Sequence, residues 1–160
     1  MRVVTWNLNG IRAAIRKGLD DWLEIIDADV LLLQEVRALP EQLPSDWSLP
    51  EGHNVIWHPA ARKGYSGVAS ISRIGINEVS RGIGTSLDPD DSEGRVLTTK
   101  CGPLTCINIY LPNGGASPER QAYKDHWLED LLAWSHDFLN SSDPVVLVGD
   151  LNIAHTENDI

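Results

Sequence analysis

The chain has 160 residues, of which 42% are hydrophobic and 22% are charged, a composition typical of one ordinary globular domain rather than a solenoid, a fibre or a disordered tail. Its formal net charge is −10, so the surface as a whole should repel anionic partners, and any contact with nucleic acid must be local. Residues 1–80 carry eight basic and ten acidic side chains, whereas residues 81–160 carry five and thirteen, which places the basic side chains early in the chain.

The first third of the chain predicts a strand, a helix, a second strand and a loop. Residues 3–6 are apolar and β-branched and end in a polar Asn-Leu-Asn-Gly turn. Apolar residues then recur in steps of three and four over residues 11–26, which predicts one amphipathic helix that continues through Gly18. Residues 30–33 are apolar at every position and predict a strand covered on both faces. Residues 38–53 contain prolines without a period and predict a loop.

The rest of the chain predicts several short strands and one long helix. Ser117-Pro118-Glu119 is a typical helix start, and the aromatic residues that follow lie on one stripe of that helix. Residues 145–148 predict a last buried strand. Together with the first third, this pattern predicts an α/β fold. The other predicted strands cover residues 54–58, 67–72, 77–80, 96–100 and 104–110.

Cysteine, histidine and apolar-run content exclude several classes of protein. Cys101 and Cys106 flank a Gly-Pro turn and are too few for a disulfide framework, so we expect free structural thiols in a reducing cytosol. No apolar run approaches the roughly 20 residues that span a bilayer, and the N-terminus lacks a signal-peptide stretch, so we expect a cytoplasmic protein without a membrane partner. Zinc is not predicted, because the histidines show no paired ligand spacing. They are His53, His58, His126, His136 and His155.

Polar side chains gather where predicted strands end. Carboxylate and amide oxygens at converging strand ends suit Mg²⁺, which indicates a Mg²⁺-dependent phosphoesterase. No glycine-rich phosphate loop, GxSxG elbow or CxxC motif is present. Taken singly, each residue also has an ordinary structural interpretation: a strand-end acid, a turn former, a helix cap or a half-buried tyrosine. The residues concerned are Asn7, Asn9, Gln34, Glu35, Tyr110, Asn113, Asp150 and Asn152.

Six segments carry a resemblance to a known family. They are TWNLNGIRA (5–13), DVLLLQEVR (29–37), KGYSGVA (63–69), EGRV (93–96), INIYLPNGG (107–115) and VVLVGDLNIAHTENDI (145–160). In this order and at these intervals they resemble exonuclease III and the related abasic-site endonucleases of the endonuclease/exonuclease/phosphatase superfamily. Superfamily members that hydrolyse inositol phosphates or sphingomyelin share fewer of these segments. The resemblance implies an α/β fold of the four-layered αββα sandwich type.

The resemblance also implies roles for individual residues. Glu35 would ligate Mg²⁺, with Mn²⁺ as an alternative ion, and Asn7 would help to place the metal and the acids. Asp150 would orient or deprotonate the attacking water, Asn152 would hold the phosphate or that acid, and Tyr110 would stabilise the developing charge. The residues implied to contact phosphate or the DNA backbone are Asn113, Arg12, Arg37, Lys63, Gly64 and Tyr65.

In the family, a second half follows the GDxN segment and supplies another catalytic Asp and a terminal Asp-His pair. We therefore interpret residues 1–160 as an incomplete domain whose C-terminal part is absent. Alone, it should cut DNA poorly or not at all. It should also expose sheet edges and an apolar inner face, and therefore aggregate, contain a disordered region or self-associate.

The implied activity is Mg²⁺-dependent hydrolysis of double-stranded DNA at abasic sites and 3′ ends, with weak and strongly salt-dependent binding. A catalytically inactive or partner-dependent module that binds DNA or protein is one alternative. A phosphoesterase for small phosphorylated molecules is another.

Overall fold

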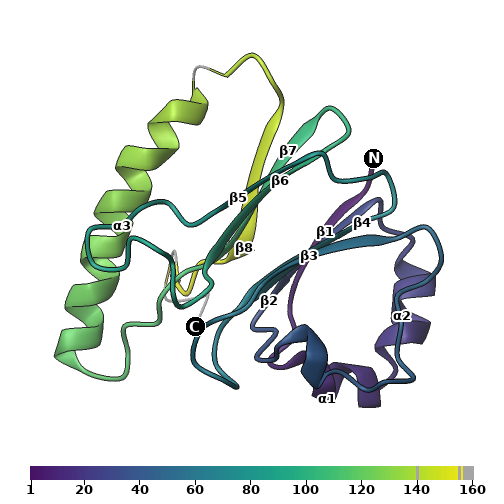
Figure 1. Cartoon of the computed structure of the whole chain (residues 1–160). Coiled ribbons are helices and arrows are strands. Elements are labelled where there is room, and N and C mark those ends of the chain that lie inside the picture. The colour runs from purple at the N-terminus through teal and green to yellow at the C-terminus, as the bar shows by residue number, and fades with distance from the viewer. Residues whose placement is uncertain (140, 155, 157–160) are drawn as a thin grey trace.

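The computed structural model describes residues 1–139, 141–154 and 156, which form two four-stranded β-sheets packed face to face with helices outside them (Figure 1). The first sheet has the order β1-β2-β4-β3, and the second has the order β5-β6-β7-β8. Both sheets are mixed, because β1 and β2 are parallel, β7 and β8 are parallel, and the other pairs are antiparallel.

The described residues form strands and helices with the following bounds. The strands of the first sheet are β1 (Val3–Asn7), β2 (Val30–Gln34), β3 (Asn54–His58) and β4 (Val68–Ser72). Those of the second sheet are β5 (Glu78–Arg81), β6 (Val96–Cys101), β7 (Leu104–Tyr110) and β8 (Val145–Asp150). The helices are α1 (Ile11–Arg16), α2 (Leu19–Ile26), the 3-10 turn η1 (Pro40–Gln42) and α3 (Pro118–Leu139).

Three apolar clusters hold these elements in a helix-sheet-sheet-helix stack. Because strand side chains alternate between faces, Leu31 and Leu33 of β2 pack under α1 and α2, while Val30 and Leu32 face the second sheet. On the far side, Trp127 of α3 packs against the outer face of β7. β2 is therefore buried at all five positions, which confirms the predicted strand covered on both faces.

Most predicted elements are confirmed, and the start of α3 is capped as expected, since the Ser117 hydroxyl accepts a hydrogen bond from the Arg120 backbone N–H at 3.3 Å. The prediction of a single helix over residues 11–26 is wrong. Gly18 has a left-handed backbone with φ of 91°, which breaks the helical hydrogen-bond ladder and separates α1 from α2. None of the described helices combines the length and apolarity needed to cross a membrane.

The last strand is more exposed than predicted. β8 has only β7 as a neighbour among the described residues, and Leu147 in its middle is 38% exposed. The expectation of a buried strand over residues 145–148 is therefore wrong, because an edge strand lacks cover on one side.

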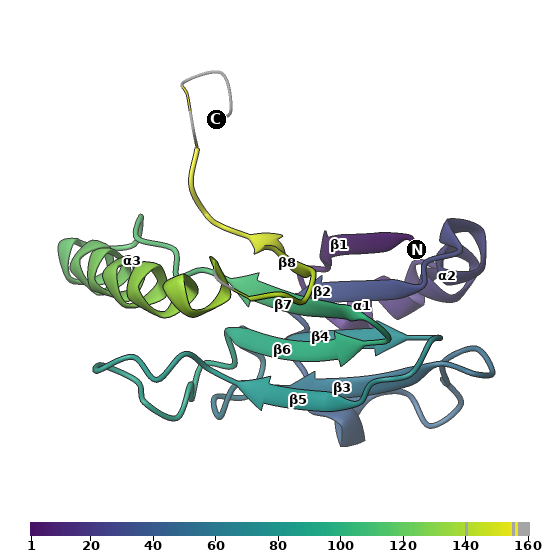
Figure 2. The same ribbon diagram turned by 90° about the horizontal axis from the view of Figure 1, so that it is seen from above.

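The expectation of an exposed apolar inner face is wrong, because the inner faces of both sheets are covered. β2 packs against β7 and β8, and β4 packs against β6 and β7, so each sheet covers the other. Cys101 and Cys106 lie in this layer as buried free thiols, as predicted. The edge strands of the two sheets are β1, β3, β5 and β8, and of these β1 and β8 lie side by side (Figure 2). Neither strand carries a charged side chain before Asp150, whereas the edge strand β5 begins with Glu78 and ends with Arg81.

A buried polar contact joins the two sheets just below the ends of β2 and β7. Asn108 of β7 is fully buried, and its Nδ2 donates to the backbone carbonyls of Leu33 at 3.1 Å and Ala69 at 2.9 Å. Its Oδ1 accepts a hydrogen bond from Gln34 Nε2 at 2.6 Å. One side chain of the second sheet thus satisfies three groups of the first.

We expect Asn108→Leu to lower the free energy of unfolding by about 2–4 kcal/mol, because it removes the partners of buried polar groups. Urea denaturation of both proteins measures this difference. Asn54→Ala, on an exposed side chain at the start of β3, is the matched control and should stay within about 0.5 kcal/mol of the unmodified chain. A loss below about 1 kcal/mol for Asn108→Leu would contradict a role in joining the sheets.

Candidate active site

The C-terminal ends of four strands meet at one end of the sandwich. Asn7 closes β1, Gln34 closes β2, Tyr110 closes β7 and Asp150 closes β8. The pairs β1–β2 and β7–β8 are parallel, so their C-terminal ends lie at the same edge of each sheet. In these pairs Asn7 is opposite Gln34, and Tyr110 is opposite Asp150. The structure thus brings together the polar strand ends singled out in the sequence.

Asn7 lies between two acids. Its Nδ2 donates to Glu35 Oε1 at 2.8 Å and to Asp150 Oδ2 at 2.6 Å. Its Oδ1 accepts the Asn9 backbone N–H at 2.9 Å, and the N-cap of α1 is Gly10, so Asn7 does not cap that helix. The side chain therefore holds two carboxylates next to each other, which opposes their mutual repulsion.

Residues 35–37 adopt an uncommon backbone conformation. Glu35 and Arg37 have φ of 50° and 49°, a left-handed region that non-glycine residues seldom occupy. Backbone hydrogen bonds clamp this segment from both sides, because Gly10 donates to Glu35 and Arg37 donates to Ser66. As a result Glu35 is 9% exposed, and its carboxylate forms an ion pair with Arg37.

The carboxyl of Glu35 and the phenol of Tyr110 are linked electrostatically. Burial by itself raises the pKa of Glu35, but hydrogen bonds from Asn7 and Tyr110 and the charge of Arg37 outweigh it and hold this pKa below its ordinary value. Burial and the neighbouring Glu35 raise the pKa of Tyr110 well above its usual range. At neutral pH the site thus contains an ionised Glu35 and a protonated Tyr110 that can donate a hydrogen bond.

The ends of β7 and β8 are tied together by Asn152. Its backbone N–H donates to Asp150 Oδ1 at 3.0 Å, and its Nδ2 donates to the Leu111 carbonyl at 2.8 Å. Asn113 Nδ2 lies 3.4 Å from Asn152 Oδ1. Lys124 of α3 donates from Nζ to the Asn152 carbonyl at 2.6 Å. This contact of Lys124 was not predicted, since a lysine on a helix is usually a solvated side chain.

Two hollows adjoin these strand ends. One, of about 660 Å³, is lined by the end of β1 and by residues 149–154, with Asn7 and Asp150 in its wall. The other, of about 410 Å³, is lined by Arg12, Arg37 and Gly64. It also contains Arg16, which the sequence did not single out because it continues the exposed face of α1.

The two remaining residues of the implied backbone track lie apart from that second hollow. Lys63 is exposed in the loop before β4. Tyr65 borders a hollow of about 370 Å³ together with Glu93 and Arg120. The structure therefore groups Arg12, Arg37 and Gly64 and places Tyr65 in a different set of contacts.

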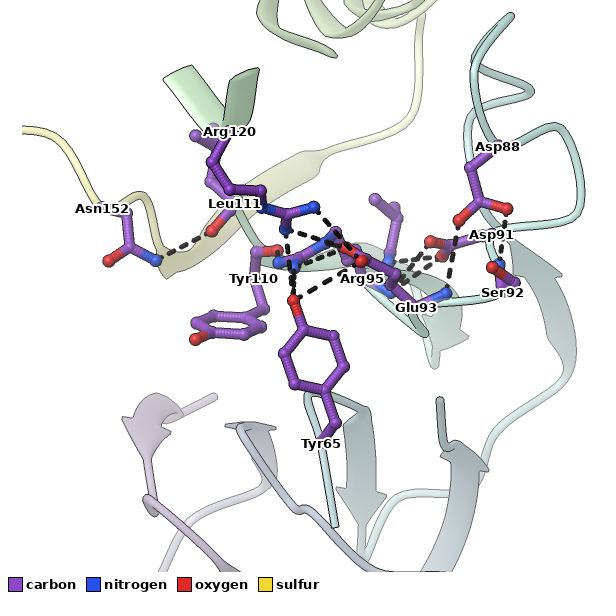
Figure 3. Close-up of polar contacts among 11 residues, drawn as sticks. Tyr65, Asp88, Asp91, Ser92, Glu93, Arg95, Tyr110, Leu111, Arg120 and Asn152 are labelled. Carbon is purple, nitrogen blue, oxygen red and sulfur yellow. Dashed lines mark hydrogen bonds and ion pairs between the residues drawn. The ribbon is translucent and has the colours of Figure 1, made fainter. Parts of the chain in front are cut away.

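That set of contacts surrounds Arg95 and Glu93 (Figure 3). Arg95 is 1% exposed, and both Arg95 and Arg120 form ion pairs with Glu93. The Tyr65 hydroxyl accepts hydrogen bonds from Arg95 at 3.1 Å and from Arg120 at 3.2 Å. The contacts of Arg95 were not predicted: the EGRV segment contributed only to the resemblance, and the available signal was a Glu-Gly-Arg triplet directly before a strand.

Comparison with known proteins identifies a family for this chain. The model of the endonuclease/exonuclease/phosphatase family matches residues 4–160. The chain belongs to this family. Within it, the chain is 38% identical to an exodeoxyribonuclease of Bacillus subtilis and 36% identical to the DNA repair nuclease APEX1 of Danio rerio. Each match covers 100% of this chain but only 62% and 51% of those proteins.

Solved structures of the family agree with the fold. A 3′ phosphatase from Neisseria bound to a product DNA hairpin superposes with a TM-score of 0.84 at 29% identity, and an AP endonuclease from Archaeoglobus fulgidus with 0.80 at 28%. Each match covers 98% of this chain and 60% of the other chain. The resemblance noted in the sequence and the α/β fold are thereby confirmed, while the chain spans only about half to three fifths of these relatives.

The donor set at the strand ends fits a hard divalent cation. Mg²⁺ uses one or two protein carboxylates and completes its shell with water and phosphate oxygens. Glu35 and Asp150, held by Asn7, offer such carboxylates. Among the described residues no three His, Cys, Asp or Glu side chains gather in one metal-binding group, so the ion would depend on water and substrate for its other ligands. His155 lies outside the described residues.

We expect the contribution of Glu93 to stability to depend on pH. Burial raises the pKa of its carboxyl, but the charges and hydrogen bonds of Arg95 and Arg120 lower it more, and the net pKa is below the ordinary 4.5. A carboxyl whose folded pKa is depressed stabilises the protein above its unfolded pKa and loses that effect as pH falls through the folded value. Glu93→Gln should therefore destabilise the chain at pH 7, and much less at pH 3. An equal loss in urea denaturation at both values would contradict the ion-pair explanation.

Proposed function

We propose that the chain carries the site of a Mg²⁺-dependent DNA repair nuclease of the abasic-site endonuclease and 3′-to-5′ exonuclease/3′-phosphatase type. The observation that carries this proposal is the pair of acids, Glu35 and Asp150, bridged by Asn7 where four strand ends meet. The names of the relatives, among them an exodeoxyribonuclease and a structure with bound DNA, support DNA as the substrate.

In the proposed mechanism Glu35 would hold the Mg²⁺, which when bound neutralises charge on the phosphoryl oxygens. Asn7 keeps Glu35 and Asp150 at a fixed separation. Asp150 accepts the proton of the attacking water, and its orientation is held by the Asn152 backbone N–H. Tyr110, which stays protonated at neutral pH, donates a hydrogen bond where negative charge accumulates on the phosphate. The amide of Asn113 supplies a further donor.

Binding of the duplex would rely on Arg12, Arg37 and Gly64 at the second hollow and on Lys63 and Tyr65 in the loop before β4. These residues would contact the sugar-phosphate backbone without reading sequence. The net charge of −10 opposes this contact elsewhere on the surface, so affinity should fall steeply as salt increases.

We further propose that residues 1–160 form part of a four-layered αββα domain and that this part alone has low activity. The support is the coverage, because the chain spans only 62% and 51% of the two relatives that it matches. The edge strands β1 and β8, which carry no charged side chain before Asp150, would also favour self-association. The same coverage leaves the alternative of a module that binds DNA without cutting it.

A duplex oligonucleotide with a tetrahydrofuran abasic analogue tests these proposals. At low salt, with the chain in large excess and Mg²⁺ present, we expect binding and slow incision on the 5′ side of the analogue. EDTA and Asp150→Asn should abolish the incision. Salt-sensitive binding with no incision at any excess would favour the binding module. Faster hydrolysis of inositol phosphates than of DNA would overturn the assignment of substrate.

A further inference from the structure

Arg95 is a buried cation between two tyrosines, and every edge of its guanidinium is used. Nη1 donates to the Tyr110 backbone carbonyl at 2.9 Å, Nε donates to Glu93 Oε2 at 2.7 Å, and Nη2 donates to the Tyr65 hydroxyl at 3.1 Å. The guanidinium carbon also lies 5.0 Å from the centre of the Tyr110 ring and 5.9 Å from that of Tyr65. Figure 3 shows Arg95 next to both Tyr65 and Tyr110.

The backbone of Arg95 is fixed as firmly as its side chain. Its N–H donates to both carboxylate oxygens of Asp91 at 2.9 and 3.0 Å, and its carbonyl accepts the Tyr110 N–H at 2.8 Å. Asp91 is itself buried and paired with His58 Nε2 at 2.8 Å. Because both ends of the residue are held, movement of Arg95 requires a rearrangement of its side-chain partners.

Tyr65 is the partner of Arg95 that belongs to the implied backbone track, and it borders the hollow of about 370 Å³. Tyr65 is half-buried in the loop before β4, and its hydroxyl accepts from Arg95 and Arg120 and donates to Glu93 at 3.4 Å. A phosphate that draws this hydroxyl toward itself changes the hydrogen bonds of Arg95, whose other side holds Tyr110.

We propose that Arg95 is a positioning residue that couples Tyr65, on the backbone track, to Tyr110 at the strand ends. The inference rests on the proposed function, because the roles of the two tyrosines come from it. Contact between a duplex and Tyr65 would change the position of the Tyr110 phenol, which donates a hydrogen bond to the phosphate. Lysine cannot replace Arg95 here, because a single ammonium does not present the planar fork that reaches Glu93, Tyr65 and Tyr110 together.

The chain contains three tyrosines, so a sample with ¹³C-labelled tyrosine ring carbons gives three assignable signals in an NMR spectrum. Tyr65→Phe removes one hydroxyl that is hydrogen-bonded to Arg95, Arg120 and Glu93, and we expect it to shift the Tyr110 signal. Arg95→Lys should shift the signals of both Tyr65 and Tyr110. Arg62→Lys is the matched control: the Arg62 guanidinium lies over the Tyr65 ring at 5.3 Å, so this change should move the Tyr65 signal and leave that of Tyr110 unchanged.

Titration with the abasic-analogue duplex completes the test. In the unmodified chain the Tyr65 and Tyr110 signals should move together, whereas in Arg95→Lys only Tyr65 should respond. A Tyr110 signal unmoved by Tyr65→Phe would overturn the coupling, and this variant carries the test if Arg95→Lys does not fold. Coupling without any response to DNA would leave the inference standing and count against the proposed function. Duplex binding and incision without coupling would do the reverse.

Discussion

Gly149→Ala is expected to lower the free energy of unfolding by about 3 kcal/mol or more and to displace Asp150. Gly149 has φ of 148°, and a Cβ at this position would lie 1.8 Å from the Ile109 carbonyl oxygen and within 3 Å of two more backbone atoms of that residue. These atoms belong to β7, which is paired with β6 and β8 and therefore cannot move away from the added methyl group. The added methyl group therefore separates β8 from its single neighbour directly before the acid that β8 positions.

Gly75→Ala is the matched control for this prediction. Gly75 also has a positive φ, of 86°, but a Cβ there would meet no atom within 4 Å. Its loss should be limited to backbone strain, about 1–2 kcal/mol. Urea denaturation of the two variants separates the effects, and equal losses would show that the close approach of β7 and β8 does not limit this position.

Glu35→Gln should weaken the binding of Mg²⁺ or Mn²⁺ at least about 10-fold, because it removes the negative charge and one ligand oxygen while leaving the shape of the side chain unchanged. Mn²⁺ titration followed by electron paramagnetic resonance measures this directly and needs no turnover. Glu41→Gln, on the exposed turn η1, removes the same charge away from the strand ends and should leave the affinity unchanged. Unaltered Mn²⁺ binding by Glu35→Gln would contradict the placement of the metal.

Sequence patterns predicted the strands and the residues at their ends because those patterns are local. The unbroken apolar run of residues 30–33 indicated a doubly covered strand, and Glu35 follows it directly. The break at Gly18 was missed because helical periodicity continues across it, while the left-handed φ depends on how α1 and α2 pack. Periodicity describes the spacing of side chains and not the path of the backbone.

The contacts among distant segments could not be predicted in the same way. Asn108 reads as an ordinary strand residue, and its role depends on carbonyls of β2 and β4 that meet it only when the sheets are packed. Arg95 likewise gains its importance from Tyr65 and Tyr110, which reach it from separate elements. The resemblance singled out candidate residues at the strand ends, but it included Arg95 in one of its segments without indicating which side chains Arg95 contacts.

The hydrogen bond between Asn7 and Asp150 joins side chains that are 143 residues apart. Closing so long a loop has an entropic cost that is repaid only after β8 has paired with β7 and the sheets have packed. The two acids therefore meet late in folding, and a chain still growing or partly unfolded holds them far apart. Under the proposed function, chemistry that needs both acids therefore requires β8 to be paired and the two sheets to be packed.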